Sequence, residues 1–429
     1  MPNQPNAIVC PKAKTNKDCQ IASPCSRNRL YFFAACAMLF VSALPDAMVV
    51  PVLKQLLVDR YGVSVGAAHA FMCVNLVGAL AAIAVAGFIR RKCNLANTIL
   101  IAAILNAALL GIMAYPIGFV PTLFLRCAEG AVDLIVYAVI FTYIARTGPS
   151  SKRGQRMGAA ATAMMLGIAC GLAVGGIIGK DTAMMCLIAG AAACLVVACA
   201  ASFAISKSTD HKDKSEPENI LSRSGLLNLW RPLAMMFSDR FVASLLVITI
   251  PLYLGSISNM SPSTIGGLVG IAMLMTAIGT WPAGRLADRF GSKRLRLICG
   301  LIYAPAVALI PYANSINLTV TLLDFLLIGI AGAGLFASSL ILIANAQRGP
   351  GAMGAYHAAG NLGFLLGPIT AGAILSTFSE SEIGVSPYLL IFIGFALLHA
   401  FVTFATVFIR TAQPVHEDTP ATSATPNLA

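Results

Sequence analysis

The chain has 429 residues, of which 58% are hydrophobic and only 11% are charged, and its mean hydropathy is +0.82. Soluble globular domains carry about 25% charged residues, so this composition excludes a water-soluble fold, a disordered chain and a disulfide-rich secreted scaffold. The formal net charge of +12 would suit a nucleic-acid partner, but the placement of the basic residues gives another explanation below.

Apolar stretches long enough to cross a bilayer recur along the whole chain. A membrane helix needs about 20 apolar residues, whereas a barrel strand needs about 10 with alternating polarity. The stretches here are long and do not alternate, so we predict an all-α membrane protein with twelve transmembrane helices. The predicted ranges are 30–57, 64–89, 95–115, 118–146, 154–179, 182–206, 229–255, 262–288, 294–313, 317–347, 351–378 and 386–410.

The segments outside these helices give the domain organisation and the orientation. We predict an N-terminal tail at 1–29, a six-helix bundle at 30–206, a central loop at 207–228, a second bundle at 229–410 and a C-terminal tail at 411–429. Most of the 29 Lys and Arg residues, Arg296 among them, fall on the side of both tails and the central loop. Cytoplasmic loops carry such an excess of cations. We therefore expect a multi-pass protein of the inner or plasma membrane with both termini cytoplasmic, and no nucleic-acid partner.

The orientation can be tested in the central loop. A cysteine placed at Ser215, in a chain without its native cysteines, should not react with a membrane-impermeant maleimide added outside sealed cells. The same cysteine should react once the membrane is permeabilised. Ready labelling in sealed cells would reverse the predicted topology.

Two sets of small residues, in the fifth and eleventh helices, are separated by the same offset of 196 residues. They are Gly167, Gly171, Gly175 and Gly176 in the first set, and Gly363, Gly367 and Pro368 in the second. Gly87 and Gly284, which end the second and eighth helices, are separated by 197 residues. This pattern indicates a six-plus-six duplication, a plan common among secondary transporters. Small residues four apart also let helices pack closely, so a packing role and a gating role both stay open.

The loop after Gly284 carries a recognisable signature. Its motif residues are Gly284, Asp288, Arg289, Gly291, Lys293 and Arg294, here called the gating motif. They resemble the G-x-x-x-D-R-x-G-x-[KR]-[KR] loop signature of the major facilitator superfamily. Arg126-x-x-Glu129-Gly130 is similar to the R-x-x-Q-G element of that family, and the helix-five glycines resemble the G-x-x-x-G-P-x-x-G-G motif of its proton-coupled antiporters.

The resemblance extends from about residue 30 to 410, with two departures. Arg91 stands where the first-half loop signature has its Asp, and Leu172 replaces the signature proline that Pro368 supplies in the eleventh helix. The resemblance implies two six-helix bundles that alternate access to a central cavity lined by helices one, four, seven and ten. We expect the gating motif to act as a reversible latch; the alternative is a permanent surface cluster of small energetic value.

Seven charged residues are predicted within the spans, and all of them fall on those four helices. They are Asp46 in helix one, Arg126, Glu129 and Asp133 in helix four, Asp239 and Arg240 in helix seven, and Asp324 in helix ten. A charge near the middle of a bilayer costs about 2.5–3.5 kcal/mol, so such groups face one another or a water-filled cavity. We therefore predict that these residues form a proton-coupling and substrate cavity.

The fourth helix places three of these charges on one face. Arg126, Glu129 and Asp133 are three and four residues apart, so Arg126 can pair with Glu129. Asp46 is predicted at the same depth and would compete with Glu129 for Arg126. A permanent structural ion pair is the alternative for Arg126 and Glu129, and capping of a proline-induced break is the alternative for Asp46.

The other predicted charges lie nearer the membrane surfaces. Asp239 and Arg240 are close to the cytoplasmic end of helix seven. They could form a cytoplasmic gate or bind the substrate, and both interpretations stay open. Asp324 is predicted near the outer end of helix ten.

Hydrolytic, redox and nucleotide-driven functions have no matching motif, since neither G-x-x-x-x-G-K-[ST] nor H-E-x-x-H is present. We therefore expect no enzyme activity, no cofactor and no metal. Our prediction is a proton-coupled exporter of a small drug-like molecule or metabolite. Two alternatives are an exporter of an anionic metabolite, such as a carboxylate siderophore anchored by Arg126 and Arg240, and a proton-driven nutrient uptake symporter. The expected partners are the lipid bilayer, protons and a small-molecule substrate, and we expect a monomer.

Overall fold

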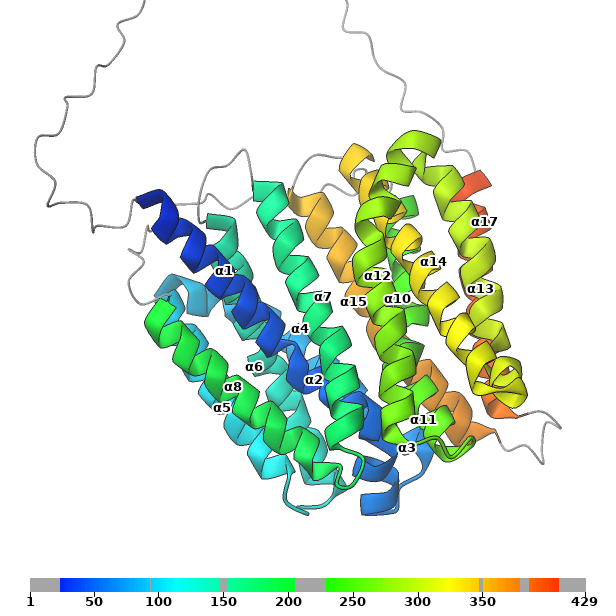
Figure 1. Cartoon of the computed structure of the whole chain (residues 1–429), viewed down its shortest axis with the longest axis horizontal. Coiled ribbons are helices and arrows are strands. Elements are labelled where there is room, and N and C mark those ends of the chain that lie inside the picture. The colour runs from blue at the N-terminus through cyan, green and yellow to red at the C-terminus, as the bar shows by residue number, and fades with distance from the viewer. Residues whose placement is uncertain are drawn as a thin grey trace, which may run out of the picture.

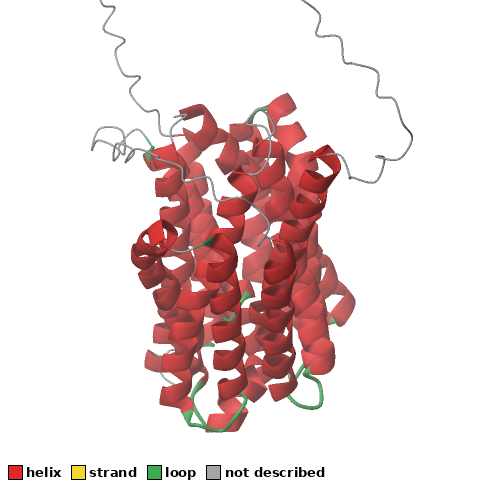
Figure 2. Cartoon of the chain, turned by 90° about the vertical axis from the view of Figure 1, so that its left-hand side faces the viewer, coloured by secondary structure: helices red, strands yellow, loops and turns green. Residues whose placement is uncertain are grey.

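A computed structural model describes residues 24–92, 94–146, 153–204, 229–346, 350–378 and 386–408, and in them every regular element is helical. The helices run roughly parallel, with loops mostly at the two ends of the bundle (Figures 1 and 2). Helices suit lipid because each one satisfies its own backbone hydrogen bonds. The predicted central loop at 207–228 and the tail at 411–429 lie outside the described residues.

The first half of the chain forms one group of packed helices, here called the N-terminal half. Its elements are α1 (Pro24–Ser42), α2 (Leu44–Val49), η1 (Val50–Val52), η2 (Lys54–Asp59), α3 (Val65–Ala68), α4 (Ala70–Lys92), α5 (Leu95–Met113), α6 (Phe119–Arg146), α7 (Arg153–Ile178) and α8 (Met184–Ala204). Helix α1 begins at Pro24, six residues before the predicted start of the first span, because its first turns extend beyond the apolar stretch.

The second half forms the other group, the C-terminal half. Its elements are α10 (Trp230–Ala243), η4 (Ser244–Leu246), α11 (Thr249–Ser256), α12 (Pro262–Phe290), α13 (Ser292–Ile316), α14 (Leu318–Ala346), α15 (Pro350–Thr377) and α17 (Pro387–Phe408). Within the described residues, eleven segments are long and apolar enough to cross a membrane. Helix α6 has 28 residues but is not among them; it carries Arg126, Glu129 and Asp133.

Side chains and glycine define several helix ends. Ser64, Asn94 and Ser261 each accept a hydrogen bond from a backbone N–H in the first turn of the following helix, which satisfies a donor that the helix itself leaves free. Gly291 separates α12 from α13 with φ +87°, a conformation that favours glycine. Gly291 of the gating motif therefore makes the turn between these two helices.

The first and seventh spans are both interrupted. The first changes from α1 to α2 at Ala43 and continues as a 3₁₀ turn and a π-helical segment, with Pro45 and Pro51 in this region. The seventh changes at η4 and restarts after Ile248. Such breaks leave backbone groups without regular partners, and transporters tolerate them where protein or water surrounds the helix.

Helix packing repeats between the halves. Gly167 of α7 lies against Phe40 of α1, and Gly363 of α15 lies against Phe237 of α10. One turn further, Gly171 meets Leu44 and Gly367 meets Phe241. A Cβ on any of these glycines would collide with the facing backbone, so the close approach requires glycine. The repeated offset seen in the sequence therefore corresponds to the same helix contact in both halves.

Among the described residues, the hydrophobic core that the two halves share lies at one end of the bundle. We call this the outer end; it holds the loops at 62–64 and 257–261. There Ala47, Val50 and Leu172 pack in one cluster with Leu246 and Ile250. Toward the other, inner end, each half has a separate cluster, one centred on α1, α5 and α6 and one on α10, α14 and α15. Within the part of the chain whose side chains are described, the halves are thus joined at the outer end and have separate clusters toward the inner end.

Candidate functional site

A buried ion cluster joins α2 of the first span to α6, the fourth span. One Nη atom of Arg126 on α6 lies 2.7 Å from Asp46 Oδ1 on α2, and the other lies 2.7 Å from Glu129 Oε2. The side chains of Arg126 and Glu129 are 0% and 1% exposed, whereas Asp46 is 32% exposed. The predicted competition of Asp46 and Glu129 for Arg126 therefore becomes simultaneous binding, with only Asp46 open to solvent.

Neighbouring side chains hold Glu129 and Arg126 in place. Asn75 of α4 donates a hydrogen bond of 2.8 Å to Glu129 Oε2, and the guanidinium of Arg126 lies 4.9 Å from the centre of the Phe71 ring. Gly130 allows this arrangement, because a Cβ there would collide with the backbone carbonyl of Asn75. The glycine beside Glu129 thus lets α4 approach α6 closely enough for Asn75 to bind the carboxylate.

Asp133 lies one turn further along α6 and is buried. Asn106 of α5 donates a long hydrogen bond of 3.4 Å to Asp133 Oδ1. The charged neighbours of Asp133 are Asp46, Glu129 and Arg126. Three carboxylates therefore surround one guanidinium, and this excess of negative charge is the arrangement in which a carboxylate takes up a proton.

A second ion cluster lies in the C-terminal half. Arg296 of α13 binds Asp239 of α10 with two hydrogen bonds of 2.7 and 2.8 Å, and His399 Nε2 of α17 lies 3.0 Å from the same carboxylate. Arg296 was assigned to the cytoplasmic loop on sequence grounds, and this was wrong. Its side chain is fully buried because α13 starts at Ser292, so residue 296 already lies within the helix, on the side that faces the bundle.

Removal of Arg296 should destabilise the protein. Arg296→Met leaves Asp239 buried with only a histidine beside it, and loss of one partner of a buried ion pair typically costs about 3–5 kcal/mol. We expect a clearly lower unfolding midpoint in detergent, measured by intrinsic fluorescence on heating. The double variant Arg296→Met, Asp239→Leu should recover part of that loss; a double variant less stable than the single one would show that the pair is not the cause.

The remaining predicted residues are placed separately. Asp324 of α14 is buried, and its Oδ2 has no hydrogen-bond partner among the described residues. Asp288, Arg289, Lys293 and Arg294 of the gating motif are exposed, and Asp288 forms no ion pair within the described part of the chain. Gly87 and Arg91 lie on α4 where side chains are not described.

The glycine series divides between two roles. Gly167, Gly171 and Gly175 face α1 and α2 of their own half, whereas Gly176 faces Pro262 of α12 across the boundary between halves. Three of the four therefore serve packing within the N-terminal half. The fourth, Gly176, belongs to the contact between the two halves at the outer end, here called the outer contact.

The outer contact also contains a buried histidine that the sequence analysis did not single out. His69, between α3 and α4, is 1% exposed, and its ring nitrogens lie 2.8 Å from Val65 O and 3.1 Å from Thr249 Oγ1 of α11. Gly372 of α15 packs against its Cβ. A hydrogen bond between side chains thus links the halves at the outer end, next to their shared core.

Other contributors were also missed. Asn75, Asn106 and His399 are single polar residues within apolar helices, and that isolation is the signal that could have identified them. Arg296 had no such signal, because three other cations precede it within seven residues.

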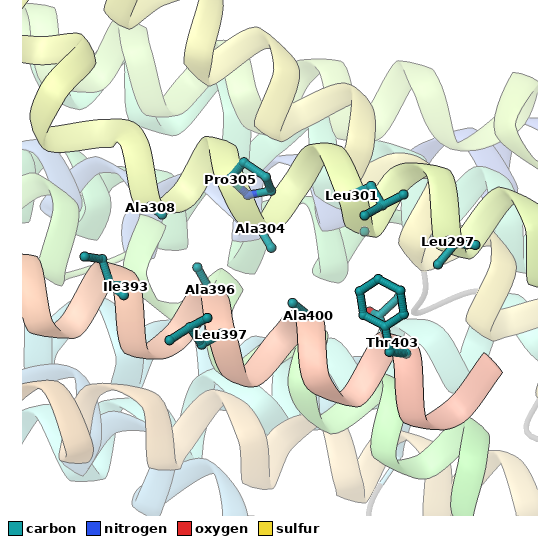
Figure 3. A pocket seen from close by; sticks show the side chains of 12 residues that line it. Leu297, Leu301, Ala304, Pro305, Ala308, Ile393, Ala396, Leu397, Ala400 and Thr403 are labelled. Atoms are coloured by element: carbon teal, nitrogen blue, oxygen red, sulfur yellow. The ribbon is translucent and has the colours of Figure 1, made fainter. Parts of the chain in front are cut away.

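A groove on the side of the bundle is unrelated to these charges. It has a volume of about 230 Å³ and lies between α13 and α17, with Leu301, Pro305, Leu397 and Ala400 among its lining residues (Figure 3). Small-molecule sites combine an apolar surface with a few placed polar groups. Thr403 is the polar side chain in this lining, so the groove suits lipid chains better than a transported substrate.

Comparison with known proteins gives a consistent picture. The family model described as Major Facilitator Superfamily matches residues 35–237 and again 233–428. An uncharacterised MFS-type transporter of Yersinia pestis is 26% identical over 304 residues, which is 69% of this chain and 73% of the relative.

Solved structures share the fold. A D-xylose–proton symporter has a TM-score of 0.69 at 15% identity, covering 87% of this chain and 96% of its own. A bacterial homologue of the human lysosomal transporter Spinster, in an inward-facing and unoccupied conformation, has a TM-score of 0.69 at 14% identity, covering 90% and 95%. A nucleoside transporter has a TM-score of 0.68 at 15% identity, covering 88% and 100%. With two family matches that together span the twelve predicted helices, the chain belongs to the major facilitator superfamily and is a multi-pass membrane transporter.

Proposed function

We propose that this transporter is a proton-coupled exporter of a small organic molecule, with Asp46, Arg126 and Glu129 as its proton-responsive cluster. The observation that carries the proposal is the sharing of one buried guanidinium by two carboxylates from different helices, of which only Asp46 is open to solvent. The helix-five glycines, whose sequence resembles the antiporter motif, support export.

Asp46 is the point where a proton enters the cluster. Protonation removes its charge and weakens its bond to Arg126, so α2 is held less firmly against α6. Ala47 and Val50, directly after Asp46, belong to the hydrophobic core that joins the halves at the outer end. A change at Asp46 therefore reaches the shared core at the outer end through a single turn of helix. In this way the proton and the substrate favour different access states.

Asp133 and Asp324 are secondary candidates for the same role. Both are buried carboxylates without a cationic partner in ion-pair contact among the described residues. Asp133 lies beside the cluster, so it can receive a proton from it. Asp324 lies in the other half and would act independently.

The gating motif acts as a latch on the inner side in this proposal. Asp288 is exposed and has no ion-pair partner among the described residues in this arrangement, where the halves are joined at the outer end, so we expect it to find its partner when the inner ends come together. Asp288→Asn should therefore lower the transport rate several-fold at normal expression, while Arg285→Gln, an exposed neighbour, should not. An unchanged rate and unchanged cysteine accessibility between the halves would assign Asp288 to the surface cluster alone.

Transport in vesicles of both orientations tests the direction and the coupling. In everted vesicles energised so that the lumen is acidic, export predicts uphill uptake of a substrate from a panel that includes ethidium and small organic acids. The protonophore-treated sample should lose this uptake. Uphill uptake only into right-side-out vesicles, driven by outside acid, would instead support the uptake symporter that the sequence left open.

The location follows from the same plan. Cytoplasmic termini, an inner or plasma membrane and a monomeric state accompany the proposal, supported by the distribution of cations in the sequence. The maleimide experiment at Ser215 tests the first of these, and the mass of the detergent-solubilised protein by light scattering tests the last.

A further inference from the structure

Arg240 on α10 has an environment unlike that of the other arginines within the spans. Arg126 binds two carboxylates and Arg296 binds one, but no carboxylate lies within ion-pair distance of Arg240 among the described residues. Its own neighbour Asp239 binds Arg296 of α13 and His399 of α17 instead. Arg240 is thus a cation within a span that has no carboxylate in ion-pair contact among the described residues.

Three helices build a setting around this side chain. The guanidinium of Arg240 lies 5.8 Å from the centre of the Phe336 ring on α14. On α15, a Cβ at Gly360 would come within 3.3 Å of Arg240 Cγ, so the glycine leaves room for the side chain. His357, one turn earlier on α15, is exposed and is an electrostatic neighbour of Arg240. The result is a cation beside an aromatic face with a histidine close by.

The guanidinium is positioned to meet a ligand. Arg240 is only partly buried, and none of its nitrogen atoms is buried without a hydrogen-bond partner. A charged side chain within a span faces an aqueous space or a partner, because exposure to lipid is too costly. With no protein partner present, its fork of N–H donors remains available, and that fork matches a carboxylate in geometry and charge.

We propose that Arg240 binds the anionic group of the transported substrate, and that Phe336 packs against the substrate's apolar body. The substrate class is therefore small amphipathic organic acids, with a carboxylate at Arg240. This inference rests on the proposed function as a small-molecule transporter. The pairing of Asp239 with Arg296 and His399 supports the site by keeping the adjacent carboxylate away from Arg240.

Equilibrium binding to the full-length protein in detergent tests the site without transport or a proton gradient. The probes are 4-hydroxybenzoate and its neutral analogue 4-hydroxybenzamide, titrated by calorimetry. A charge-assisted hydrogen bond to a carboxylate predicts that the wild type binds the benzoate about tenfold tighter than the benzamide. Arg240→Gln should remove this preference, and Arg285→Gln, which changes an exposed arginine stacked on Trp281, should retain it.

Several outcomes would overturn the site. They are equal affinity of the wild type for both probes, no binding of either at about 10 mM, or a retained preference in Arg240→Gln. If Arg240→Gln does not fold, Arg240→Lys carries the test, with a fall of about threefold in benzoate affinity and none in benzamide affinity. An unchanged benzoate affinity in Arg240→Lys would equally reject it.

The same titration separates this inference from the proposed coupling. Asp46→Asn should keep the preference for benzoate, because Asp46 belongs to the other half. If the preference holds and Asp46→Asn transports like the wild type, the anion site stands and the proton cluster fails. If Asp46→Asn loses coupling while the wild type shows no preference, the cluster stands and the anion site fails.

Discussion

Replacement of Arg126 by alanine should abolish transport and destabilise the protein more than any other single change in the cluster. The substitution leaves Glu129 buried and Asp46 half-buried without their cation, next to a third carboxylate at Asp133. Loss of one partner from a buried ion pair typically costs about 3–5 kcal/mol, and here one arginine serves two carboxylates. We expect transport at background level and a lower unfolding midpoint, measured in proteoliposomes and in detergent.

A conservative variant separates charge from geometry at this position. Arg126→Lys keeps the positive charge, but its compact ammonium lacks the planar, widely spaced donors with which the guanidinium reaches two carboxylates at once. It should recover much of the stability and little of the transport. Full transport in Arg126→Lys would show that only the charge matters, and normal stability in Arg126→Ala would contradict the buried cluster itself.

Neutralisation of Asp46 or Glu129 should uncouple transport from the proton gradient. Asp46→Asn and Glu129→Gln keep the size and the hydrogen-bonding ability of the side chains but can no longer change charge. We expect gradient-driven accumulation to disappear while exchange of substrate between the two sides continues. Both rates can be measured in the same proteoliposomes, with and without an imposed pH gradient.

The two variants should also differ from one another. Asp46 is open to solvent and Glu129 is not, so Asp46→Asn should destabilise the protein less than Glu129→Gln. Glu129→Gln keeps the bond from Asn75 to an amide oxygen and should retain more stability than Arg126→Ala. If both variants still accumulate substrate uphill with normal pH dependence, the cluster is structural, and coupling must be sought at Asp133, Asp239 or Asp324.

The sequence predicted the helices and the Arg126 cluster because both depend on local rules. Length and apolarity define a span, and a spacing of three or four residues places Arg126 and Glu129 on one helix face. The common depth of Asp46 and Arg126 followed from the rise per residue of a helix. All of these arguments use distances along one chain segment.

Apart from the pairing of Asp46 with Arg126, contacts between distant helices were beyond that reasoning. The partners of Asp239 are Arg296 and His399. Residue spacing alone does not show which way these side chains face, or that α13 and α17 are neighbours of α10. The link between His69 and Thr249 joins residues 180 positions apart, and it depends on which end of the bundle is closed. A single sequence contains no direct signal for either.

The duplicated packing has a consequence for how a substrate is held. The glycine contacts repeat between the halves, but the charges do not: by the offset of 197 residues that relates Phe40 to Phe237, Asp46 corresponds to Ala243, and Arg240 to Ala43. Two identical halves would offer a bound molecule two equivalent poses, related by a half-turn about the membrane normal. Because the charged residues differ between equivalent helices of the two halves, the two poses are no longer equivalent. We therefore expect the two halves to create an electric dipole in the plane of the membrane, and a polar substrate between them to bind in one orientation rather than two.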